Sequence, residues 1–522
     1  MTPQRSLLKV KGFGPLLAAQ ALGAFNDNAF RAIVSLTALS SQSSSRSLLV
    51  AAAGALFVLP YLLFSTTAGW LADRFSKRTV VVAVKCAEIG VMTLGAAALM
   101  SGSAAAAPSV PMLLGVLFLL GTQAAFFSPA RLGIIPELVA EEELSRANGL
   151  MELATFTAII GGVVGGGLML VTFGVGSPRP AIILVALSVG GALASLAVRK
   201  VPASGARRPF RLNVIAEVVD DFRAIARSRP LLLTVLGVAW FWFLGMIFQL
   251  NVLVYGRDLM NLDDRGVTLL NACVSIGIGL GAVIAGRLSG DMVELGLVPL
   301  GSIGLGFFAI VLFFAHVSLP AAAAAHALLG ISAGFFIVPL EAYLQQRSPP
   351  NQRGKIIASS NFLAFTGVIL GSGWVALTGG LLRWNPATVV LATGLLSLAA
   401  TVYILTLLPD ALVRLVLWLL THTVYRITVR GAGNLPKQGG ALLVCNHISF
   451  VDAFLVGAST QRFVRFLMYR PIYEAPGINW FARLMGCIPV SEKDGRKGIA
   501  LALNAARDRL VAGDLVCIFA EG

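Results

Sequence analysis

The sequence has few charged residues for its length. Of its 522 residues, 12% are charged and 57% are hydrophobic, which is too little charge to cover the surface of a soluble protein of this size. Cysteine is also scarce, and the five cysteines are scattered without a CxxC pair, so neither a disulfide framework nor a metal site is indicated. The composition favours a protein of the lipid bilayer.

The net charge of +15 does not indicate nucleic-acid binding. Such binding needs a basic run interleaved with aromatic residues on a soluble domain, and the sequence has no such run. A polytopic membrane protein instead gathers Lys and Arg on its cytoplasmic loops, beside anionic headgroups. A cleavable signal peptide is not evident either, since Arg5, Lys9 and Lys11 precede a long apolar segment that lacks a small-residue cleavage site.

Long apolar segments predict membrane spans. Windows of about 20 apolar residues predict two sets of six, near residues 13–40, 47–72, 78–101, 110–135, 148–173 and 178–198, then 230–256, 266–289, 296–316, 319–346, 355–381 and 386–408. The polar, Arg-rich stretch from Arg199 to Pro230 separates the two sets. We therefore expect an all-α polytopic membrane fold in two six-helix halves.

An internal repeat supports the two halves. Residues 126–131 (FFSPAR) line up with residues 335–341 (FFIVPLE), and residues 152–157 (ELATFT) match residues 361–366 (NFLAFT). Duplicated halves with a site between them are typical of transporters.

The basic residues predict the orientation. With the N-terminus inside, one side of the membrane holds Arg5, Lys9, Lys11, Arg74, Lys77, Arg78, the arginines of the central stretch, Arg347, Arg353 and Lys355. The other side holds only Arg46, Arg179, Arg257, Arg265 and Arg383. This asymmetry predicts that both termini face the cytoplasm.

A charged turn joins the second and third spans. It reads GWLADRFSKR over residues 69–78, and a degenerate counterpart, GRLSGD, covers residues 286–291. The turn resembles the loop signature of the major facilitator superfamily, although an ordinary charged turn is the alternative. The resemblance implies a twelve-helix fold and a conformational latch, with four gating residues: Gly69, Asp73, Arg74 and Arg78.

The first span carries ionisable residues, which are costly inside a membrane and usually face a polar cavity. Asp27 and Arg31 lie one helical turn apart, where they can pair. This cluster resembles the lysophospholipid transporter branch of the superfamily, together with WFWFLG at 240–245 and ELGLVP at 294–299. The expected transport cavity comprises Asp27, Asn28, Arg31, Arg131 and Glu341, although structural pairing is equally compatible with each of them.

An exporter of drugs or other amphipathic solutes is the alternative function. Antiporters of the superfamily carry a Gly-Pro signature in the fifth span, whereas this chain reads GGVVGGG over residues 161–167 without a proline. Drug–proton antiport is therefore disfavoured.

The pattern changes after Asp410. Residues 411–420 are too short a segment to cross the bilayer and predict an interfacial helix. Residues 425–430 alternate like a strand, and residues 441–445 resemble a buried strand that leads directly into Asn446 and His447. A soluble α/β domain is expected to begin here.

His447 and Asp452 form a candidate acid–base pair. If a helix begins soon after the strand, the Asp452 carboxylate can fix the imidazole tautomer and stabilise its charge. No protein nucleophile stands beside them, so the activated hydroxyl would belong to the substrate, which suits acyl transfer from a thioester to an alcohol. A lone pair at this spacing is a weak signal, because it is more often structural.

The longer context resembles the glycerolipid acyltransferase family. Its signatures are matched by NHISFVD at 446–452, GCIPVS at 486–491 and FAEG at 519–522. The resemblance implies that His447 and Asp452 are catalytic, with His447 as general base. It also implies an acyl carrier protein (ACP) or coenzyme A thioester as acyl donor, no bound cofactor, and substrate-binding roles for Ser449, Gly486, Glu521 and Gly522.

The chain departs from the family pattern at three points. The second signature usually brings an arginine for the phosphate, whereas Glu492-Lys493 and Arg496-Lys497 stand near that point, and Ala520 replaces a proline in the third. The sequence also stops inside the third signature. This predicts a partial sequence whose acyltransferase part is inactive as it stands.

These observations predict a two-part protein of the bacterial inner membrane. Residues 1–409 would flip lysophospholipids resembling lysophosphatidylethanolamine to the cytoplasmic leaflet, and residues 410–522 would begin the domain that re-acylates them. Such a fusion resembles the acylglycerophosphoethanolamine acyltransferase group. The expected partners are lysophospholipid, membrane lipid and acyl carrier protein, with no nucleic acid.

Overall fold

The computed structural model describes residues 6–40, 46–101, 109–174, 177–206, 209–210, 214–290, 293–407, 413, 416–417, 419–420, 427–431, 434–436, 439–449, 451–460 and 462–520. By its internal contacts the chain forms two compact units. The first comprises residues 1–293 and 301–397, and the second comprises residues 294–300 and 398–522.

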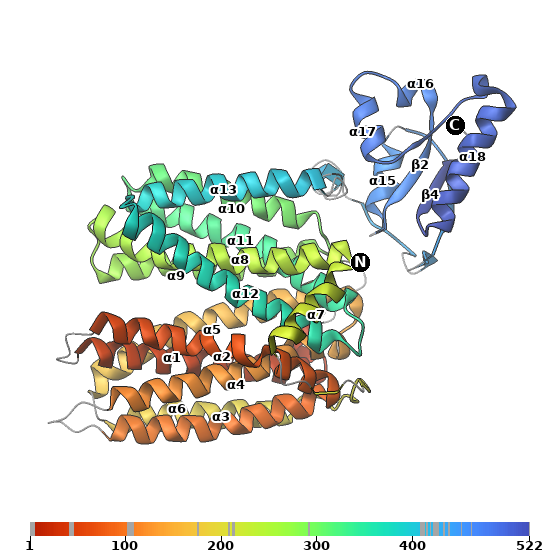
Figure 1. Ribbon diagram of the computed structural model, residues 1–522. Coiled ribbons are helices and arrows are strands. Elements are labelled where there is room, and N and C mark those ends of the chain that lie inside the picture. The colour runs from red at the N-terminus through yellow and green to blue at the C-terminus, as the bar shows by residue number, and fades with distance from the viewer. Residues whose placement is uncertain are drawn as a thin grey trace. The chain divides into compact units, whose positions relative to one another are not determined.

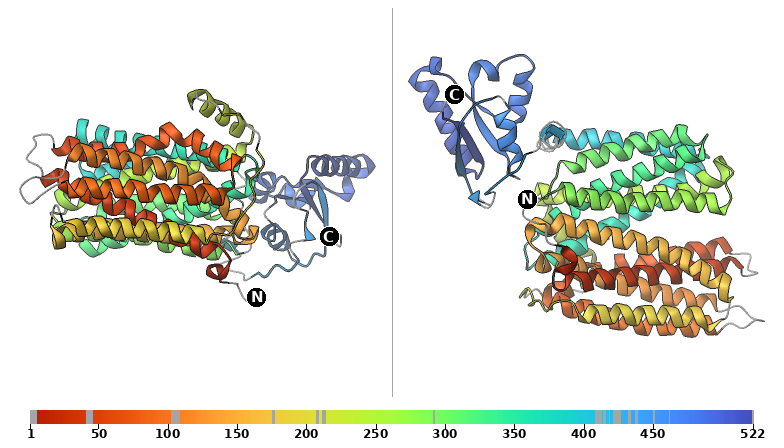
Figure 2. Two further views of the ribbon diagram at one scale, coloured as in Figure 1. Left: turned by 90° about the horizontal axis from the view of Figure 1, so that it is seen from below. Right: turned by 180° about the vertical axis from the view of Figure 1, so that it is seen from behind.

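The long helices fall into two sets of six. Figures 1 and 2 show them as two bundles. The N half consists of α1 (Phe13–Ser40), α2 (Arg46–Arg74), α3 (Lys77–Met100), α4 (Val110–Leu138), α5 (Leu144–Phe173) and α6 (Pro178–Leu196). The C half consists of α8 (Arg229–Val254), α9 (Asp264–Leu288), α10 (Leu297–Ala315), α11 (Leu319–Arg347), α12 (Arg353–Val375) and α13 (Pro386–Leu407). Short helical turns are η1 (Leu7–Lys9), η2 (Glu141–Glu143), η3 (Tyr255–Leu259) and η4 (Ala376–Leu381).

Within the described residues, 11 of these helices are long and apolar enough to cross a membrane. The remaining long helix, α1, is less apolar because it carries Gln20, Asn26, Asp27, Asn28 and Arg31 among its polar residues. The protein is therefore a polytopic membrane protein, and the predicted all-α fold in two halves is confirmed.

Small residues bring the helices of the N half together. A Cβ atom on Gly162 would lie 2.4 Å from the Phe25 carbonyl oxygen, and one on Gly166 would lie 2.4 Å from the Ala29 carbonyl oxygen. Helices α5 and α1 therefore pack backbone to backbone, as small residues permit in membranes. Phe30 of α1 is fully buried in the adjoining apolar core.

A shorter helix, α7 (Val214–Ala226), follows the central polar stretch. Its inner face buries Asp221, whose carboxylate lies 2.5 Å from the Lys355 Nζ atom and accepts a hydrogen bond of 3.2 Å from the Ser359 hydroxyl. Its outer face leaves Val219 and Phe222 exposed. The Asp221 carboxylate thus fastens helix α7 to α12.

The second unit contains a parallel sheet with the strand order β1-β4-β2-β3. Its strands are β1 (Ala441–Cys445), β2 (Val464–Tyr469), β3 (Ile488–Val490) and β4 (Leu515–Phe519), and its helices are α15 (Asp452–Ala458), α16 (Arg470–Tyr473), α17 (Ile478–Leu484) and α18 (Gly495–Val511), with the short turn η7 (Glu492–Asp494). Because the strands are parallel, their carboxyl ends meet at one edge. The α/β prediction is confirmed.

Two local expectations for this region need comment. The sequence predicts a strand at residues 425–430. The described part, residues 427–430, forms no strand, so this prediction is wrong there. Val429 is exposed and pairs with no neighbouring strand. In the segment expected to be interfacial, Val413 and Leu417 are buried in the core beneath the sheet. These two residues therefore belong to the fold of the second unit.

Candidate functional sites

The charged turn after α2 lies against the first residues of α12. The Asp73 carboxylate accepts hydrogen bonds from the backbone N–H groups of Gly354, at 2.7 Å, and Lys355, at 2.9 Å. It thereby satisfies free donors at the start of α12 and places a negative charge at the positive end of that helix. Asp73 thus joins the two halves, as a latch requires.

Glycine makes this contact possible. A Cβ atom on Gly69 would lie 2.7 Å from the Ala358 Cβ atom and 3.0 Å from the Gly354 carbonyl oxygen. Any side chain at Gly69 would therefore separate α2 from α12 and pull Asp73 away from its donors.

The basic residues of the turn hold neighbouring loops rather than the other half. Arg78 donates to the carbonyl oxygens of Leu196, at 2.8 Å, and Val198, at 3.0 Å, at the end of α6. Arg74 donates to the Ala206 carbonyl oxygen at 3.5 Å. Gly69 and Asp73 therefore connect the halves, whereas Arg74 and Arg78 order the N half around them.

The degenerate counterpart makes a similar approach between α9 and α5. A Cβ atom on Gly286 would lie 2.9 Å from the Ser145 carbonyl oxygen. Nearby, the side chains of Asn148 and Gln345 exchange two hydrogen bonds of 2.9 Å between α5 and α11. We call this end of the bundle, with Asp73, Gly354, Asn148 and Gln345, the latch end. The two halves are closed against each other there.

Charged side chains gather inside the N half. Arg31 donates to the Asn28 side-chain oxygen at 2.6 Å, so it is not ion-paired with Asp27 as the helical spacing allowed. Behind them, the Lys85 Nζ atom lies 2.6 Å from the Glu88 carboxylate, and both side chains are buried. Asp27 and Arg31 keep part of their surface accessible, as groups lining an internal cavity do.

The sequence interpretation missed Lys85 and Glu88. The available signal was the presence of two ionisable residues within an apolar span, which is itself an indication of function or pairing. Gly23 leaves room for the lysine, because a Cβ atom there would lie 2.1 Å from the Lys85 Nζ atom. Asn26 also donates to the Glu88 carboxylate at 3.5 Å.

A second charged cluster joins the halves. The repeat-related residues Arg131 of α4 and Glu341 of α11 lie close enough to interact electrostatically with each other and with Glu152 of α5. Arg131 and Glu341 are both partly accessible. Beside them, Tyr61 of α2 stacks on Phe365 of α12 with ring centroids 3.8 Å apart. The predicted cavity residues thus belong to two charged clusters, and Tyr61 interacts electrostatically with Asp27 of the first and Arg131 of the second.

In the second unit, His447 and Asp452 lie at the carboxyl edge of the sheet. The His447 Nδ1 atom is 3.1 Å from the Asp452 Oδ2 atom, which also accepts the backbone N–H groups of Ile448, at 2.7 Å, and Ser449, at 2.8 Å. The sequence predicts that a helix begins soon after the strand, and helix α15 begins at Asp452. The Nδ1–H group can donate to the carboxylate, which leaves Nε2 free to accept a proton.

The Asp452 carboxylate is held in its charged form. The backbone N–H groups of Ser449 and Ile448, and then the His447 side chain, lower the pKa of Asp452 below its usual value. The imidazole ring of His447 also stacks on Phe519 of β4, with centroids 4.3 Å apart. The tautomer and the plane of the imidazole are therefore both fixed.

The expected substrate-binding residues of this unit have different positions. Ser449 forms the turn around Asp452. Gly486 has a φ of +60°. A Cβ atom on Gly486 would lie 2.4 Å from the Nη1 atom of the Arg465 guanidinium. Their contact with substrate stays a prediction. Glu521 and Gly522 lie outside the described residues.

Arg470 is a further charged residue at this edge that the sequence interpretation missed. It follows β2 directly, and its guanidinium forms hydrogen bonds of 3.0 and 3.1 Å to both oxygens of Asp494, which follows β3. Asp494 raises the pKa of Arg470, so this guanidinium stays charged. The sequence signal was its position one residue after an apolar strand.

Comparison with known proteins identifies both parts. Residues 16–372, more than half of the chain, match the profile of the Major Facilitator Superfamily. The chain belongs to the major facilitator superfamily. Residues 426–522 match the profile of the Acyltransferase family, so the superfamily transporter fold is followed by an acyltransferase segment.

Within the superfamily, the chain is similar to lysophospholipid transporters. The lysophospholipid transporter LplT of Escherichia coli O157:H7 (strain EC4115 / EHEC) is 31% identical over 373 residues, which cover 70% of this chain and 88% of LplT. LplT of Shigella boydii serotype 18 (strain CDC 3083-94 / BS512) is similar to the same extent.

Solved structures support the fold. A bacterial homologue of the iron transporter ferroportin in an outward-facing state has a TM-score of 0.57 at 17% identity, covering 75% of this chain and 98% of its own. The E. coli fucose:proton symporter FucP has a TM-score of 0.59 at 15% identity, covering 75% and 97%. At this identity they establish the major facilitator fold alone.

Proposed function

We propose that this protein moves lysophospholipids across the bacterial inner membrane to the cytoplasmic leaflet by alternating access. The observation that carries the proposal is the 31% identity to LplT over 88% of that transporter. The partly accessible charged residues inside the bundle support it, because a zwitterionic or anionic headgroup needs polar partners away from water.

The charged cluster around Asp27 and Arg31 suits the two ends of such a headgroup. A lysophosphatidylethanolamine carries a phosphate anion and an ammonium cation, for which Arg31 and Asp27 provide opposite charges on one helix. The stacked Tyr61 and Phe365 rings, with Trp242 at 6.4 Å from Phe365, provide an apolar surface for the acyl chain. Headgroup and chain would therefore be accommodated by different walls of the cavity.

The latch would control access from one side. We propose that the latch end faces the cytoplasm, since most basic loop residues lie at that end and Lys and Arg favour the cytoplasmic side. The closed contact of Asp73 with α12 then corresponds to a state that opens outward. Release of Gly354 and Lys355 from Asp73 would open the cytoplasmic side.

We further propose that the acyltransferase segment, residues 410–522, re-acylates the arriving lysolipid in the intact protein. The His447 Nε2 atom would take the proton of the glycerol hydroxyl as its oxygen attacks the thioester carbonyl. The C–S bond breaks and the sulfur takes a proton, so an ester and a free thiol result. The donor would be acyl-ACP or acyl-CoA, and an acyl-ACP donor would make acyl carrier protein a partner. Attachment to the transporter, residues 1–409, raises the local acceptor concentration.

The transport proposal is tested in vesicles with fluorescent lysophosphatidylethanolamine and a quencher added to one side. The wild type should move the probe between leaflets, and Asp27→Asn should slow this movement by about tenfold or more, because a buried charged contact to the headgroup is lost. Asp264→Asn is the matched control, since that carboxylate is 84% exposed at the start of α9.

The same vesicles distinguish the alternative function. Export of an amphipathic drug with no movement of the lysolipid would overturn the proposal in favour of the drug exporter. Equal loss in Asp27→Asn and Asp264→Asn would show that Asp27 does not contact the headgroup.

A further inference from the structure

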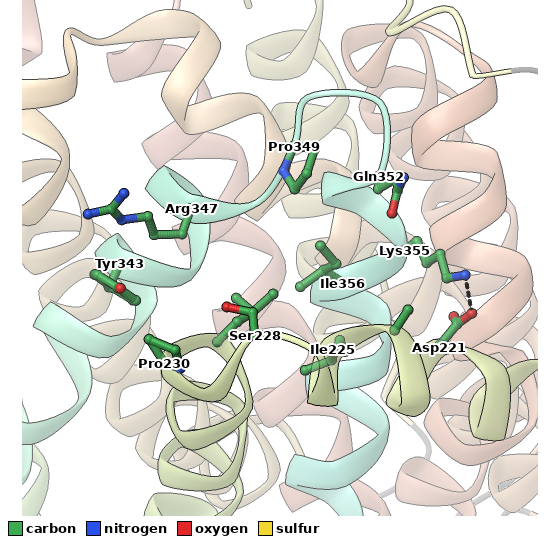
Figure 3. A pocket seen from close by; sticks show the side chains of 12 residues that line it. Asp221, Ile225, Ser228, Pro230, Tyr343, Arg347, Pro349, Gln352, Lys355 and Ile356 are labelled. Carbon is green, nitrogen blue, oxygen red and sulfur yellow. Dashed lines mark ion pairs between the residues drawn. The ribbon is translucent and has the colours of Figure 1, made fainter. Parts of the chain in front are cut away.

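A cavity of about 490 Å³ lies between α7, the start of α8, the end of α11 and the start of α12. It is separate from the charged clusters inside the bundle, and the transport proposal assigns it no role. Figure 3 shows its lining residues, with Arg347 and Tyr343 at one end and the Asp221–Lys355 ion pair at the other.

The charge at the Arg347 end is available to a ligand. In the part of the chain that the structure describes, no carboxylate pairs with the Arg347 guanidinium, which lies 5.5 Å above the Tyr343 ring. The single carboxylate of the lining, Asp221, already has its oxygens on Lys355 and Ser359. The cavity therefore carries one excess positive charge, at Arg347.

The middle of the cavity is apolar. Ile225 and Ile356 lie between the two charged ends, and the Ser228 hydroxyl faces the same space without capping α8. A cation and hydroxyl groups beside an apolar wall fit a ligand with an anionic head and an apolar body. A small soluble anion would leave the apolar wall unused.

The position of the cavity indicates where such a ligand comes from. Helix α8 begins at Arg229, α11 ends at Arg347 and α12 begins at Arg353, so the cavity lies where three spans leave the bilayer. Helix α7 exposes Val219 and Phe222 on its outer face, which is typical of a helix at the membrane interface. Basic pockets at this depth bind anionic lipid headgroups.

We propose that this cavity binds an anionic phospholipid of the leaflet at the latch end. The lipid phosphate lies against Arg347, with the Tyr343 and Ser228 hydroxyls as further donors. Its glycerol backbone and the first part of an acyl chain cover Ile225 and Ile356. The site is distinct from the transport cavity, and it exists whether or not the transported solute is a lysophospholipid.

The test uses the full chain in nanodiscs that contain either spin-labelled phosphatidylglycerol or spin-labelled phosphatidylcholine. Electron paramagnetic resonance measures the motionally restricted fraction of each label. The wild type should restrict phosphatidylglycerol more strongly than phosphatidylcholine. Arg347→Gln should lower the relative association constant of phosphatidylglycerol by about fivefold, the effect of one basic residue at a membrane surface, and Arg347→Lys should restore part of it.

Arg223→Gln is the matched control. It removes one arginine from the exposed face of α7, where the guanidinium is 74% exposed and outside the cavity. It should leave the preference unchanged, whereas an equal loss in Arg223→Gln and Arg347→Gln would show diffuse surface attraction and overturn the site. Tyr343→Phe, which keeps the ring but removes a donor, should weaken the preference without affecting the fold, as thermal unfolding in phosphatidylcholine checks.

A competition experiment distinguishes a bound lipid from a bound soluble phosphodiester. Glycerophosphoglycerol, the deacylated headgroup, should not displace the labelled lipid. Displacement by it would assign the cavity to a soluble anion and overturn the lipid proposal. Equal restriction of both labelled lipids in the wild type would overturn it as well.

Discussion

Asp452 fixes the turn after β1 through several hydrogen bonds to one oxygen. Its Oδ2 atom accepts from Ile448, Ser449 and His447, so its charge and its position are determined together. The sequence could suggest the partner of His447 from its spacing. It could not show that two backbone N–H groups hold the carboxylate.

Replacing Asp452 with Asn should reduce acyl transfer by the intact protein. The amide cannot keep the His447 tautomer with Nε2 free, so we expect kcat to fall by about 10²–10⁴. The measurement is the rate of ester formation from thioester and lysolipid. Asp508→Asn, on the exposed face of α18, is the control, and a near-normal rate in Asp452→Asn would contradict the assigned role.

The lowered pKa of Asp452 also predicts a pH dependence. A carboxyl group whose pKa is lower in the folded state stabilises the fold above its unfolded value, about 3.9, and loses this contribution as the pH falls through the folded value. Wild-type His447 and its turn should therefore stay ordered at pH 5. Nuclear magnetic resonance of the His447 ring between pH 7 and pH 4 measures this, and disorder of the turn already at pH 5 would refute it.

At the level of elements, Gly69 determines how closely α2 and α12 approach. Gly69→Ala should oppose the closed latch by about 1–3 kcal/mol, the usual cost of overpacking, and so shift the population toward the open latch by about 5–150-fold. Distances between spin labels on exposed Lys200 and Asn351 report the opening. Gly90→Ala is the control, because a Cβ atom there meets nothing within 4 Å, and an unchanged distance distribution in Gly69→Ala would argue against the latch.

The Lys85–Glu88 pair is a second test at this scale. Lys85→Met should destabilise the protein by about 3–5 kcal/mol, because it leaves a buried carboxylate without its cation. The double variant Lys85→Met, Glu88→Met should recover most of that loss, since a buried pair is often replaceable by apolar residues. Thermal unfolding in detergent measures both. If the double variant does not recover stability, the pair also stabilises Asp27 or Asn26.

At the level of the whole molecule, two activities should be separable. His447→Ala should abolish acyl transfer by the intact protein and leave lysolipid flipping at the wild-type rate, because His447 lies in a different compact unit from the transport cavity. Both rates are measured in the same vesicles. Loss of flipping in this variant would mean that the units are coupled by more than attachment.

The membrane class, the two halves and most helix bounds follow from the sequence, because apolar runs long enough to span a bilayer have few alternatives. The sequence also located the Gly69–Arg78 turn and the His447–Asp452 pair, because local spacing dictates contacts within one turn or one helix. The sequence could not predict that Arg31 would donate its hydrogen bond to Asn28, or that residues 427–430 would form no strand. Both outcomes depend on competing partners in three dimensions.

Which distant groups meet depends on the packing of the folded chain. The contact of Asp73 with the start of α12, the pairing of Asp221 with Lys355 and the approach of Arg470 to Asp494 join residues far apart in the chain. Each depends on how helices or strands pack, and a one-residue shift in that packing would replace one partner by another. Local sequence patterns specify which groups are available, whereas packing selects the pairs that form.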